Sequence, residues 1–358
     1  MIRELIKFEH FWPISITCFG TLFILFFCYN FAQSINLVDH PDWRKDHEGR
    51  VPLIGGIAIV FGFSLGCLIS PRGMTEWRPL FVCMIPLLVI GIMDDHGDLS
   101  VIKRISAQLL GCIAMVYYGD IYLNNLGDIF GTGNILKLNI FELIFTIFCV
   151  IGVVNSLNLI DGSDGLCAVV SLVACIGIIS VVKLKGADAS IALILYFAFA
   201  LLSFVIVNLG LTGGFIKKVF LGDAGSTIIG FFLCWYFIRL SQSESNIIKP
   251  INTIWLLALP IMDTLSVMIR RIRNNRSPFN AGRDHIHHLL LEMGYSSKLV
   301  LLILSIFSIT MAVFGVISEV NNFQECYSFY SILLLFVVYH LLSEKLYRLI
   351  TNRKKPSS

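Results

Sequence analysis

The chain has 358 residues, of which 56% are hydrophobic, whereas Asp, Glu, Lys and Arg together supply only 14%. Soluble domains carry about 25% charged residues, so this composition excludes an ordinary soluble enzyme, a disordered chain and a nucleic-acid-binding protein. The net charge of +3 is too small to indicate a polyanionic partner. We therefore expect an all-α polytopic membrane protein, with one integral membrane domain over 1–358 and a basic tail at 344–358.

The hydrophobic residues are gathered in long runs along the chain. A helix needs about 20 such residues to cross a bilayer, and the runs predict about eleven transmembrane helices. The fourth run is short and follows two basic residues, Lys103 and Arg104. In chain order the predicted helices lie near residues 11–33, 52–70, 79–93, 105–118, 140–160, 166–182, 189–207, 226–238, 251–269, 299–318 and 328–343.

The basic residues are unevenly divided between the two sides of this arrangement. An odd number of spans places the termini on opposite sides, so the connecting loops fall into two alternating sets. The set that includes the N-terminus holds 9 of the 27 Lys and Arg residues, and the other set holds 18. The positive-inside rule predicts a periplasmic N-terminus, a cytoplasmic C-terminal tail and cytoplasmic loops near 34–51, 94–104, 161–165, 208–225 and 270–298.

Every unusual polar cluster falls in the predicted cytoplasmic set. A transporter needs ionisable groups near the bilayer midplane that both sides can reach. Clusters at one face instead indicate an active site that opens to the cytoplasm. The five clusters are Arg44-Lys45-Asp46-His47, Asp94-Asp95-His96-Gly97-Asp98, Asp161-Gly162-Ser163-Asp164-Gly165, Gly222-Asp223-Ala224-Gly225-Ser226 and Asp284-His285-Ile286-His287-His288.

Adjacent carboxylates at the end of a predicted helix indicate a metal site. Asp94 and Asp95 follow the third run directly, and Asp98 lies three residues further along. Neighbouring carboxylates repel each other unless a cation neutralises them, and Mg²⁺ is usually bound by one or two carboxylates plus substrate phosphates. The alternative interpretation is an acidic loop that simply ends a helix in water.

Amides and carboxylates together surround the turn after the fifth run. Asn155, Asn158 and Asp161 are spaced by three residues, so on a helix they lie along one side. Unpaired amides are costly inside a membrane span. A turn between two spans would explain the glycines within 162–165, but it would not explain the amides together with Asp164. We therefore expect this segment to contact a ligand.

The turn before the eighth run adds a third carboxylate. Gly-Asp is common in turns, and Ser226 could simply cap a helix, so Gly222-Asp223 is a weak motif on its own. Asp223 becomes informative because it lies at the same predicted face as Asp94 and Asp95.

Three histidines in the longest predicted loop indicate a polar ligand. His285, His287 and His288 lack a cysteine partner, and their spacing is unusual for zinc. Basic and imidazole donors beside a membrane instead suit a diphosphate or a sugar. The arginines within 270–276 fit an interfacial loop that faces lipid headgroups. We therefore assign the arginines to orientation in the bilayer and the histidines to the substrate.

Taken in order, these motifs resemble those of the polyprenyl-phosphate N-acetylhexosamine-1-phosphate transferases, from about Val38 to the end of the tenth run. Ile286 interrupts the histidines and Asp98 stands where the muramoyl-pentapeptide branch usually has a lysine, so the GlcNAc branch is favoured. His96 and Gly97 stand where that branch often has an arginine, so no role for such an arginine is expected. The motifs are Asp94-Asp95-x-x-Asp98, Asn155-x-x-Asn158-x-x-Asp161-Gly-x-Asp164-Gly-Leu166, Phe220-x-Gly222-Asp223-x-Gly225-Ser226 and His285-Ile286-His287-His288.

The resemblance implies a reaction, a cofactor and a place in the cell. GlcNAc-1-phosphate would pass from UDP-GlcNAc to undecaprenyl phosphate, with release of UMP and a requirement for Mg²⁺ or Mn²⁺. The enzyme would be a multi-pass protein of the bacterial inner membrane with its site facing the cytoplasm. The reaction would be the first membrane step of O-antigen or enterobacterial common antigen synthesis, and therefore part of lipopolysaccharide biosynthesis.

The resemblance also implies roles for individual residues. Asp94 and Asp95 would be catalytic, and Asp223 with Asp95 would hold the metal. The remaining candidates would bind the substrates, with Asn158, Asp161, Asp164, Gly222, His285, His287 and His288 on the donor side and Lys45, His47 and Arg50 on the lipid phosphate.

Several alternatives remain open at this point. A prenyltransferase of the Asp-rich class needs two Asp-rich motifs, and only 94–98 qualifies. An intramembrane aspartyl protease needs Gly-x-Gly-Asp, but position 220 is Phe. A transporter is opposed by the one-sided clusters. The same chemistry with another UDP-HexNAc donor is consistent with the motifs, and the sequence leaves the oligomeric state open, a homo-oligomer included.

The predicted topology can be tested with impermeant thiol reagents on intact cells. Single cysteines introduced at Lys45 or Arg276 should not react, because both lie in predicted cytoplasmic loops, whereas one introduced at Asn134 should react. Labelling at Arg276 from outside the cell would overturn the arrangement.

Overall fold

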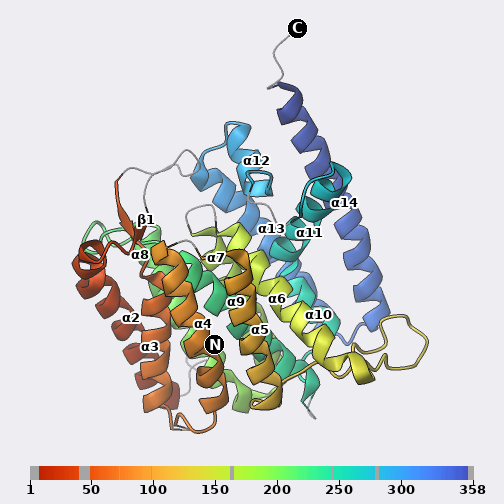
Figure 1. The fold of residues 1–358 in the computed structure, drawn as a ribbon. Helices are drawn as coiled ribbons and strands as arrows, with labels where there is room; N and C mark the ends of the chain where they lie inside the picture. The colour runs from red at the N-terminus through yellow and green to blue at the C-terminus, as the bar shows by residue number, and fades with distance from the viewer. Residues whose placement is uncertain are drawn as a thin grey trace.

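The computed structural model describes residues 8–39, 49–71, 73–97, 99–161, 165–243, 246–278 and 282–353. These residues are mostly helical, and each apolar run of the sequence coincides with one helix or with a pair of helices (Figure 1). The α-helices are α2 Phe8–Ser34, α3 Gly55–Ile69, α4 Arg78–Gly97, α5 Val101–Tyr117, α6 Glu142–Ile160, α7 Leu166–Leu184, α8 Ile191–Asn208, α9 Gly222–Gln242, α10 Pro250–Leu256, α11 Ala258–Arg273, α12 Ile286–Glu292, α13 Ser297–Val320 and α14 Glu325–Arg353. Two short 3₁₀ helices, Asn139–Phe141 and Asp188–Ser190, precede α6 and α8.

The helices confirm a multi-pass membrane protein. Within the described residues, 8 helices are long and apolar enough to cross a bilayer, and the bent pair α10–α11 brings the number to 9. The count of eleven and the orientation of the termini stay predictions. The difference comes from α3, whose 15 residues extend only about 22 Å at 1.5 Å per residue, and from α5, whose 17 residues carry Lys103 and Arg104 in the first turn.

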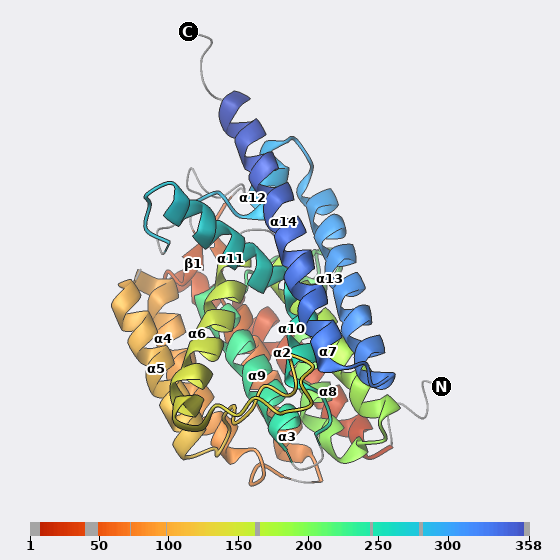
Figure 2. The same ribbon diagram turned by 90° about the vertical axis from the view of Figure 1, so that its right-hand side faces the viewer.

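Two neighbouring helices, α8 and α9, form the centre of the bundle. In their most apolar segments 83% of α8 and 89% of α9 is buried within the protein, compared with 28% of α13 and of α14. Phe197 of α8 stacks on Phe232 of α9 with ring centroids 3.7 Å apart, and Phe63 of α3 meets both rings edge-on. Figure 2 shows α13 and α14 side by side at one edge of the bundle. The outer helices therefore present their apolar surfaces to lipid.

The start of α9 is held on two sides by close backbone contacts. Two short strands, β1 (Val38–Asp39) and β2 (Val51–Pro52), pair antiparallel. After β2, the N–H groups of Gly55 and Gly56 donate to the carbonyls of Phe220 and Leu221, both at 3.0 Å. On the other side, a Cβ on Gly91 of α4 would lie 2.3 Å from the Cα of Ala224. A methyl group would not fit at Gly55, Gly56 or Gly91, so the backbone packs closely around the first turn of α9 on both sides.

The ninth predicted span is broken into two helices. The axes of α10 and α11 differ by 84°, and the break falls at Leu257. The buried carboxylate of Glu319 in α13 fixes α10, because it accepts hydrogen bonds from Asn252 Nδ2 at 2.7 Å and from the N–H of Lys249 at 2.8 Å, and it pairs with Lys185. The bend turns α11 towards the end of the molecule where α12 lies (Figure 2).

The predicted motif loops gather at one end of the bundle. In both views β1, α12 and the C-terminal part of α14 lie at the upper end of the molecule, and the loop between α5 and α6 lies at the opposite end (Figures 1 and 2). The C-terminus of α4 and the N-terminus of α9 meet on the upper side as well, because Asp95 contacts the first turn of α9.

Candidate active site

Three carboxylates meet where α4 ends and α9 begins. Asp94 and Asp95 are in the last turn of α4, and Asp223 is the second residue of α9. The two oxygens of Asp95 accept hydrogen bonds from the N–H of Asp223 at 2.6 Å and from the N–H of Ala224 at 3.1 Å. A carboxylate in this position satisfies free N–H groups at the positive end of the helix dipole. Asp95 therefore joins the two helices, in addition to any part in the chemistry.

Gly222 allows this contact to form. Its φ of +76° lies in the left-handed region that side chains disfavour. A Cβ at this position would also lie 2.6 Å from Asp95 Oδ2. The glycine was predicted to lie beside a ligand, and the described structure places it beside Asp95.

The amide of Asn158 brings α6 into the same group. Its Nδ2 donates to Asp223 Oδ1 at 2.6 Å and to Ser226 Oγ at 3.0 Å. Ser226 was considered as a helix cap, but α9 begins four residues earlier and Ser226 lies within it. Asp161 follows one turn after Asn158 as the C-terminal cap of α6 and is half-buried. The prediction was that these residues share one side of a helix, and the structure places Asn158 on the side of α6 that meets the start of α9.

Arg104 supplies a cation that the sequence reading did not assign. Its Nη1 lies 3.3 Å from Oδ2 of Asp94. Asp94 is only 5% exposed, and its Oδ1 accepts a hydrogen bond from the N–H of Leu99 at 2.7 Å. No arginine role was expected in this motif because His96 and Gly97 replace one, but an arginine from the next helix reaches the same carboxylate. The available signal was a charged residue within the first turn of a span, where unpaired charge is costly.

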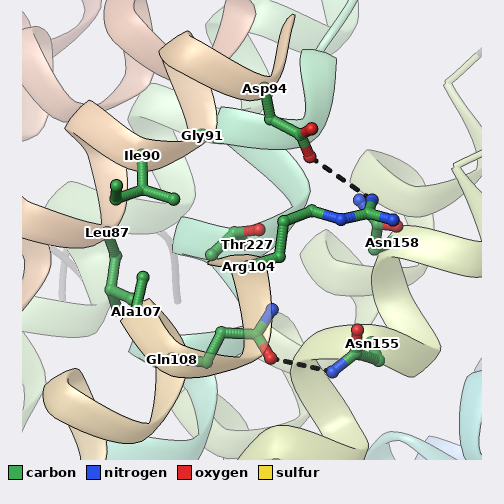
Figure 3. Close-up of a pocket in the computed structure, with 10 residues that line it drawn as sticks. All are labelled: Leu87, Ile90, Gly91, Asp94, Arg104, Ala107, Gln108, Asn155, Asn158 and Thr227. Carbon is green, nitrogen blue, oxygen red and sulfur yellow. Dashed lines mark hydrogen bonds and ion pairs between the residues drawn. The ribbon is translucent and has the colours of Figure 1, made fainter. Parts of the chain in front are cut away.

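A narrow pocket opens beside this pair. It lies between α4, α5, α6 and α9, with Arg104 and Asp94 on one side and the amides of Gln108 and Asn155 on another (Figure 3). Leu87, Ile90 and Ala107 form its apolar wall. The pocket therefore combines an ionic end with a less polar interior.

The residues present fit a divalent cation that is shared with a substrate. Among the described residues, no three His, Cys, Asp or Glu side chains are arranged to hold a metal ion by themselves. Mg²⁺, however, is typically held by one or two carboxylates together with phosphate oxygens and water. Asp94 Oδ2 is buried and makes no hydrogen bond besides its ion pair with Arg104, and the charges of Asp94 and Asp95 both interact unfavourably with that of Asp223. A cation at this position would relieve both conditions.

The histidines form a second polar group, built on a buried carboxylate of α11. Asp263 Oδ2 lies 2.8 Å from Nδ1 of His285, and its Oδ1 accepts from the N–H of Ile286 at 3.0 Å and from Tyr339 Oη at 2.9 Å. His287 is fully buried, and its ring lies 4.1 Å from that of His288. Asp263 was not predicted. Its signal in the sequence was a single carboxylate inside an apolar run.

The histidines have nitrogen atoms free for a ligand. Both nitrogens of His287, Nε2 of His285 and Nδ1 of His288 are buried and make no hydrogen bond within the described structure. Burial holds the pKa of His287 well below its usual value, and burial with the nearby Arg283 lowers the pKa of His288 to about 4. Both rings are therefore neutral at pH 7, and a neutral imidazole offers one donor and one acceptor.

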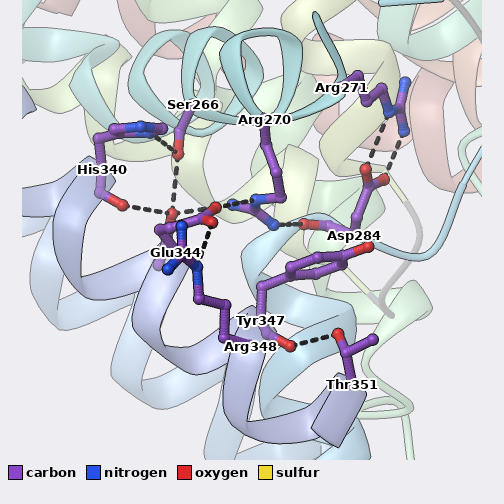
Figure 4. Close-up of polar contacts among 10 residues, drawn as sticks. Ser266, Arg270, Arg271, Asp284, His340, Glu344, Tyr347, Arg348 and Thr351 are labelled. Carbon is purple, nitrogen blue, oxygen red and sulfur yellow. Dashed lines mark hydrogen bonds and ion pairs between the residues drawn. The ribbon is translucent and has the colours of Figure 1, made fainter. Parts of the chain in front are cut away.

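The assignment of the arginines to lipid headgroups is wrong for Arg270 and Arg271. These side chains are 2% and 6% exposed. Arg270 donates to Glu344 at 3.2 Å and to the carbonyl of Asp284 at 2.9 Å, while Arg271 Nε donates to the Asp284 carboxylate at 2.9 Å (Figure 4). Burial alone would raise the pKa of Asp284, but the hydrogen bonds and charge of Arg271 outweigh it and lower the pKa. The arginines thus hold the histidine segment against α11 and α14.

The other predicted site residues are not brought into either group. Lys45, His47, Asp98 and Asp164 lie outside the described residues. Arg50 is exposed and makes no hydrogen bond or ion pair with the rest of the described chain. No hydrogen bond or ion pair within the described structure joins the histidine group to the carboxylate group. The roles predicted for all of these residues stay predictions.

Comparison with known proteins identifies the family. The model of glycosyl transferase family 4 matches residues 77–241. A protein of Pasteurella multocida strain Pm70 is 38% identical over 330 residues, which are 91% of this chain and 91% of the relative. One from Escherichia coli strain K12 is 34% identical over 310 residues, 87% of this chain and 84% of the relative. The chain belongs to glycosyl transferase family 4. Both relatives are named undecaprenyl-phosphate alpha-N-acetylglucosaminyl 1-phosphate transferase.

Membership of the family makes this protein a transferase and agrees with the position of the carboxylate group. The matched range contains Asp94, Asp95, Asn158 and Asp223 together with Arg104. The histidine group lies C-terminal to the matched range. The resemblance inferred from the motifs is therefore confirmed.

The bonds of Asp95 predict a loss of stability when its charge is removed. Asp95→Asn retains one acceptor oxygen but turns an NH₂ group towards an N–H donor of α9. We expect the free energy of unfolding to fall by about 1–2 kcal/mol, which lowers the midpoint of thermal unfolding in detergent. In Asp223→Asn the oxygen that accepts from Asn158 is retained, so this control should unfold at the wild-type temperature. Equal midpoints for Asp95→Asn and the wild type would contradict the bridging role.

Proposed function

We propose that the protein transfers GlcNAc-1-phosphate from UDP-GlcNAc to undecaprenyl phosphate, releasing UMP and forming undecaprenyl-diphosphate-GlcNAc. The observation that carries the proposal is the meeting of Asp94, Asp95 and Asp223 with Arg104 at one end of a membrane bundle. The printed names of the relatives support it. The reaction is the first membrane step of O-antigen or enterobacterial common antigen-type synthesis.

The location of the site suits these two substrates. Undecaprenyl phosphate has its phosphate at the membrane surface and its hydrocarbon chain in the bilayer, whereas a nucleotide sugar is dissolved in the cytoplasm. A site at the end of the bundle is accessible to both. We place this end at the cytoplasmic face of the bacterial inner membrane, because the loops there carry 18 of the 27 Lys and Arg residues.

The chemistry is the exchange of one diphosphate for another. An oxygen of undecaprenyl phosphate forms a bond to the phosphorus that carries the sugar, and the bond from this phosphorus to the bridging oxygen breaks, so that UMP leaves with that oxygen. Such a reaction requires mostly positioning and neutralisation of charge. Asp94 orients the lipid phosphate or takes its proton, and Arg104 offsets negative charge beside it.

The proposed cofactor is Mg²⁺ or Mn²⁺. Asp223 and Asp95 would hold it, and the hydrogen bonds of Asp95 to the first turn of α9 keep the two carboxylates close together. When bound, the ion neutralises diphosphate oxygens that would otherwise repel the incoming phosphate. Asn158 directs the Asp223 carboxylate through its hydrogen bond, and Asp161 and Asp164 contact the nucleotide.

The proposal is tested by assaying purified protein with undecaprenyl phosphate and a panel of UDP-sugars. Formation of undecaprenyl-diphosphate-GlcNAc and an equal amount of UMP supports it. Transfer from a different UDP-HexNAc only would retain the chemistry and change the donor. Accumulation of an unmodified substrate in sealed vesicles, without UMP, would instead identify a transporter.

Removing the charge of Asp223 should stop the reaction without unfolding the protein. Asp223→Asn retains the size and the hydrogen bond from Asn158 but lowers the negative charge available to the metal. We expect turnover to fall by at least about 10²-fold, with an increased requirement for Mg²⁺ in steady-state assays. Full activity of this variant would show that the carboxylate only completes a turn.

The free imidazole nitrogens predict an effect on the donor substrate. We expect His288→Ala to raise the apparent KM for UDP-GlcNAc by about 10-fold, the value of one lost hydrogen bond to a polar ligand, while the KM for undecaprenyl phosphate stays the same. His287→Ala should also raise this KM, but because His287 is fully buried the substitution is expected to lower the stability of the protein as well. His340→Ala, another histidine at the α11–α14 contact, is the matched control. A change confined to the lipid KM would assign the histidines to the acceptor.

A further inference from the structure

The pocket beside Asp94 contains two amide side chains that the roles above do not use. Gln108 of α5 and Asn155 of α6 lie next to each other in its lining (Figure 3). Asn155 Nδ2 donates to Gln108 Oε1 at 2.9 Å and to the main-chain carbonyl of Ile151 at 2.8 Å. Gln108 is 7% exposed. Polar groups of this kind inside a membrane bundle mark functional positions when they remain partly unpaired.

The hydrogen bonds fix which atom of each amide faces the pocket. A main-chain carbonyl only accepts, so the atom of Asn155 next to Ile151 is the nitrogen. The atom of Gln108 that faces this nitrogen must then be the oxygen. The Nε2 of Gln108 and the Oδ1 of Asn155 make no hydrogen bond within the described structure, and Figure 3 shows both turned towards the pocket. The pocket therefore presents one donor and one acceptor side by side.

The amide pair lies next to the ionic groups of the site. Gln108 follows Arg104 by four residues, and Asn155 precedes Asn158 by three, so each amide is one helical turn from a residue of the carboxylate group. Arg104 contacts Asp94, and Asn158 contacts Asp223. A ligand group bound by the amides would therefore lie close to the reacting phosphate.

We propose that Gln108 and Asn155 bind the acetamido group of the donor sugar. The proposal rests on the function proposed above. A secondary amide carries one carbonyl acceptor and one N–H donor, which match Gln108 Nε2 and Asn155 Oδ1 in turn. In an N-acetylhexosamine 1-phosphate the acetamido group is on C2, adjacent to the carbon that carries the phosphate. The group that matches the amides is thus also the group nearest to the phosphorus that reacts.

The same geometry argues against the other two parts of the substrates. The uracil ring also offers an N–H and carbonyls, but a ribose and a second phosphate separate it from the sugar phosphate. The undecaprenyl chain offers no polar atoms beyond its phosphate, and hydrocarbon against these amides would leave a donor and an acceptor unpaired, which costs free energy. The acetamido group is close enough to the reacting phosphorus and can pair with both Gln108 Nε2 and Asn155 Oδ1.

The consequence is selection for N-acetylated donors. A hexose with a hydroxyl on C2 is too short to reach both amides and leaves one of them unpaired. Sites built around such hydrogen bonds reject analogues that lack them more strongly than apolar pockets do. Gln108 and Asn155 are therefore specificity-determining residues for this transferase.

The experiment compares binding of three ligands to protein purified in detergent with Mg²⁺. UDP-GlcNAc, UDP-glucose and UDP are titrated into the wild type, Gln108→Met and a control, Gln242→Met, whose glutamine binds the loop at the opposite end of the bundle. We expect Gln108→Met to raise the Kd for UDP-GlcNAc by about 10-fold and to change the Kd for UDP-glucose and for UDP by less than about 2-fold. The control should resemble the wild type for all three.

Other results would overturn the proposal. Equal weakening of all three ligands would assign the amides to the uridine diphosphate or to the fold, and unchanged binding of UDP-GlcNAc would exclude a contact. If Gln108→Met does not fold, Gln108→Asn, which shortens the side chain by one methylene, is measured with the same expectation. Transfer by the wild type is assayed separately, so that loss of the proposed reaction is distinguishable from loss of the acetamido contact.

Discussion

The hydrogen bonds of Asp95 to the first turn of α9 are the interaction on which the site depends. They join the end of one membrane helix to the start of another, and in doing so they place Asp94 and Asp223 near each other. Hydrocarbon cannot satisfy the free N–H groups at a helix start, so a carboxylate is more useful here than at a soluble surface. The lack of a side chain at Gly91 allows α4 to approach the backbone of Ala224 closely. The Asp95 carboxylate thus caps the N-terminus of α9 and positions the carboxylates of Asp94 and Asp223.

A second carboxylate performs the same task for the histidines. Asp263 ties His285 and the start of α12 to α11, and Tyr339 attaches α14 to the same atoms. Arg270 and Arg271 add ionic contacts around Asp284. Beside these contacts, four nitrogens of His285, His287 and His288 make no hydrogen bond within the described residues. The histidine segment is thus fixed in position, and its imidazole nitrogens can still bind a ligand.

Much of this arrangement follows from the sequence, and the failures have physical reasons. Apolar runs predicted the helices well, since hydrocarbon allows few alternatives to a helix. The runs did not predict the 84° bend, because α10 and α11 together have the length of one span. Asp94, Asp223 and Asn158 were predicted to lie together from their shared face. Arg104 and Asp263 were missed, because the partners of both charges come from other segments of the chain. Periodicity reports the faces of one helix and carries no information about which other helix meets them.

The bend at Leu257 also determines the rotational setting of α11. Each residue of an α-helix turns the following side chains by about 100° and advances them by about 1.5 Å. The contacts of Glu319 fix α10, so the residue count across the break decides which side of α11 faces α12. One residue more or fewer at the break would move Asp263 about a quarter of a turn away from His285. The number of residues at the break therefore sets the rotation of α11 about its axis, so an insertion or deletion there would disturb the site as much as the loss of a side chain.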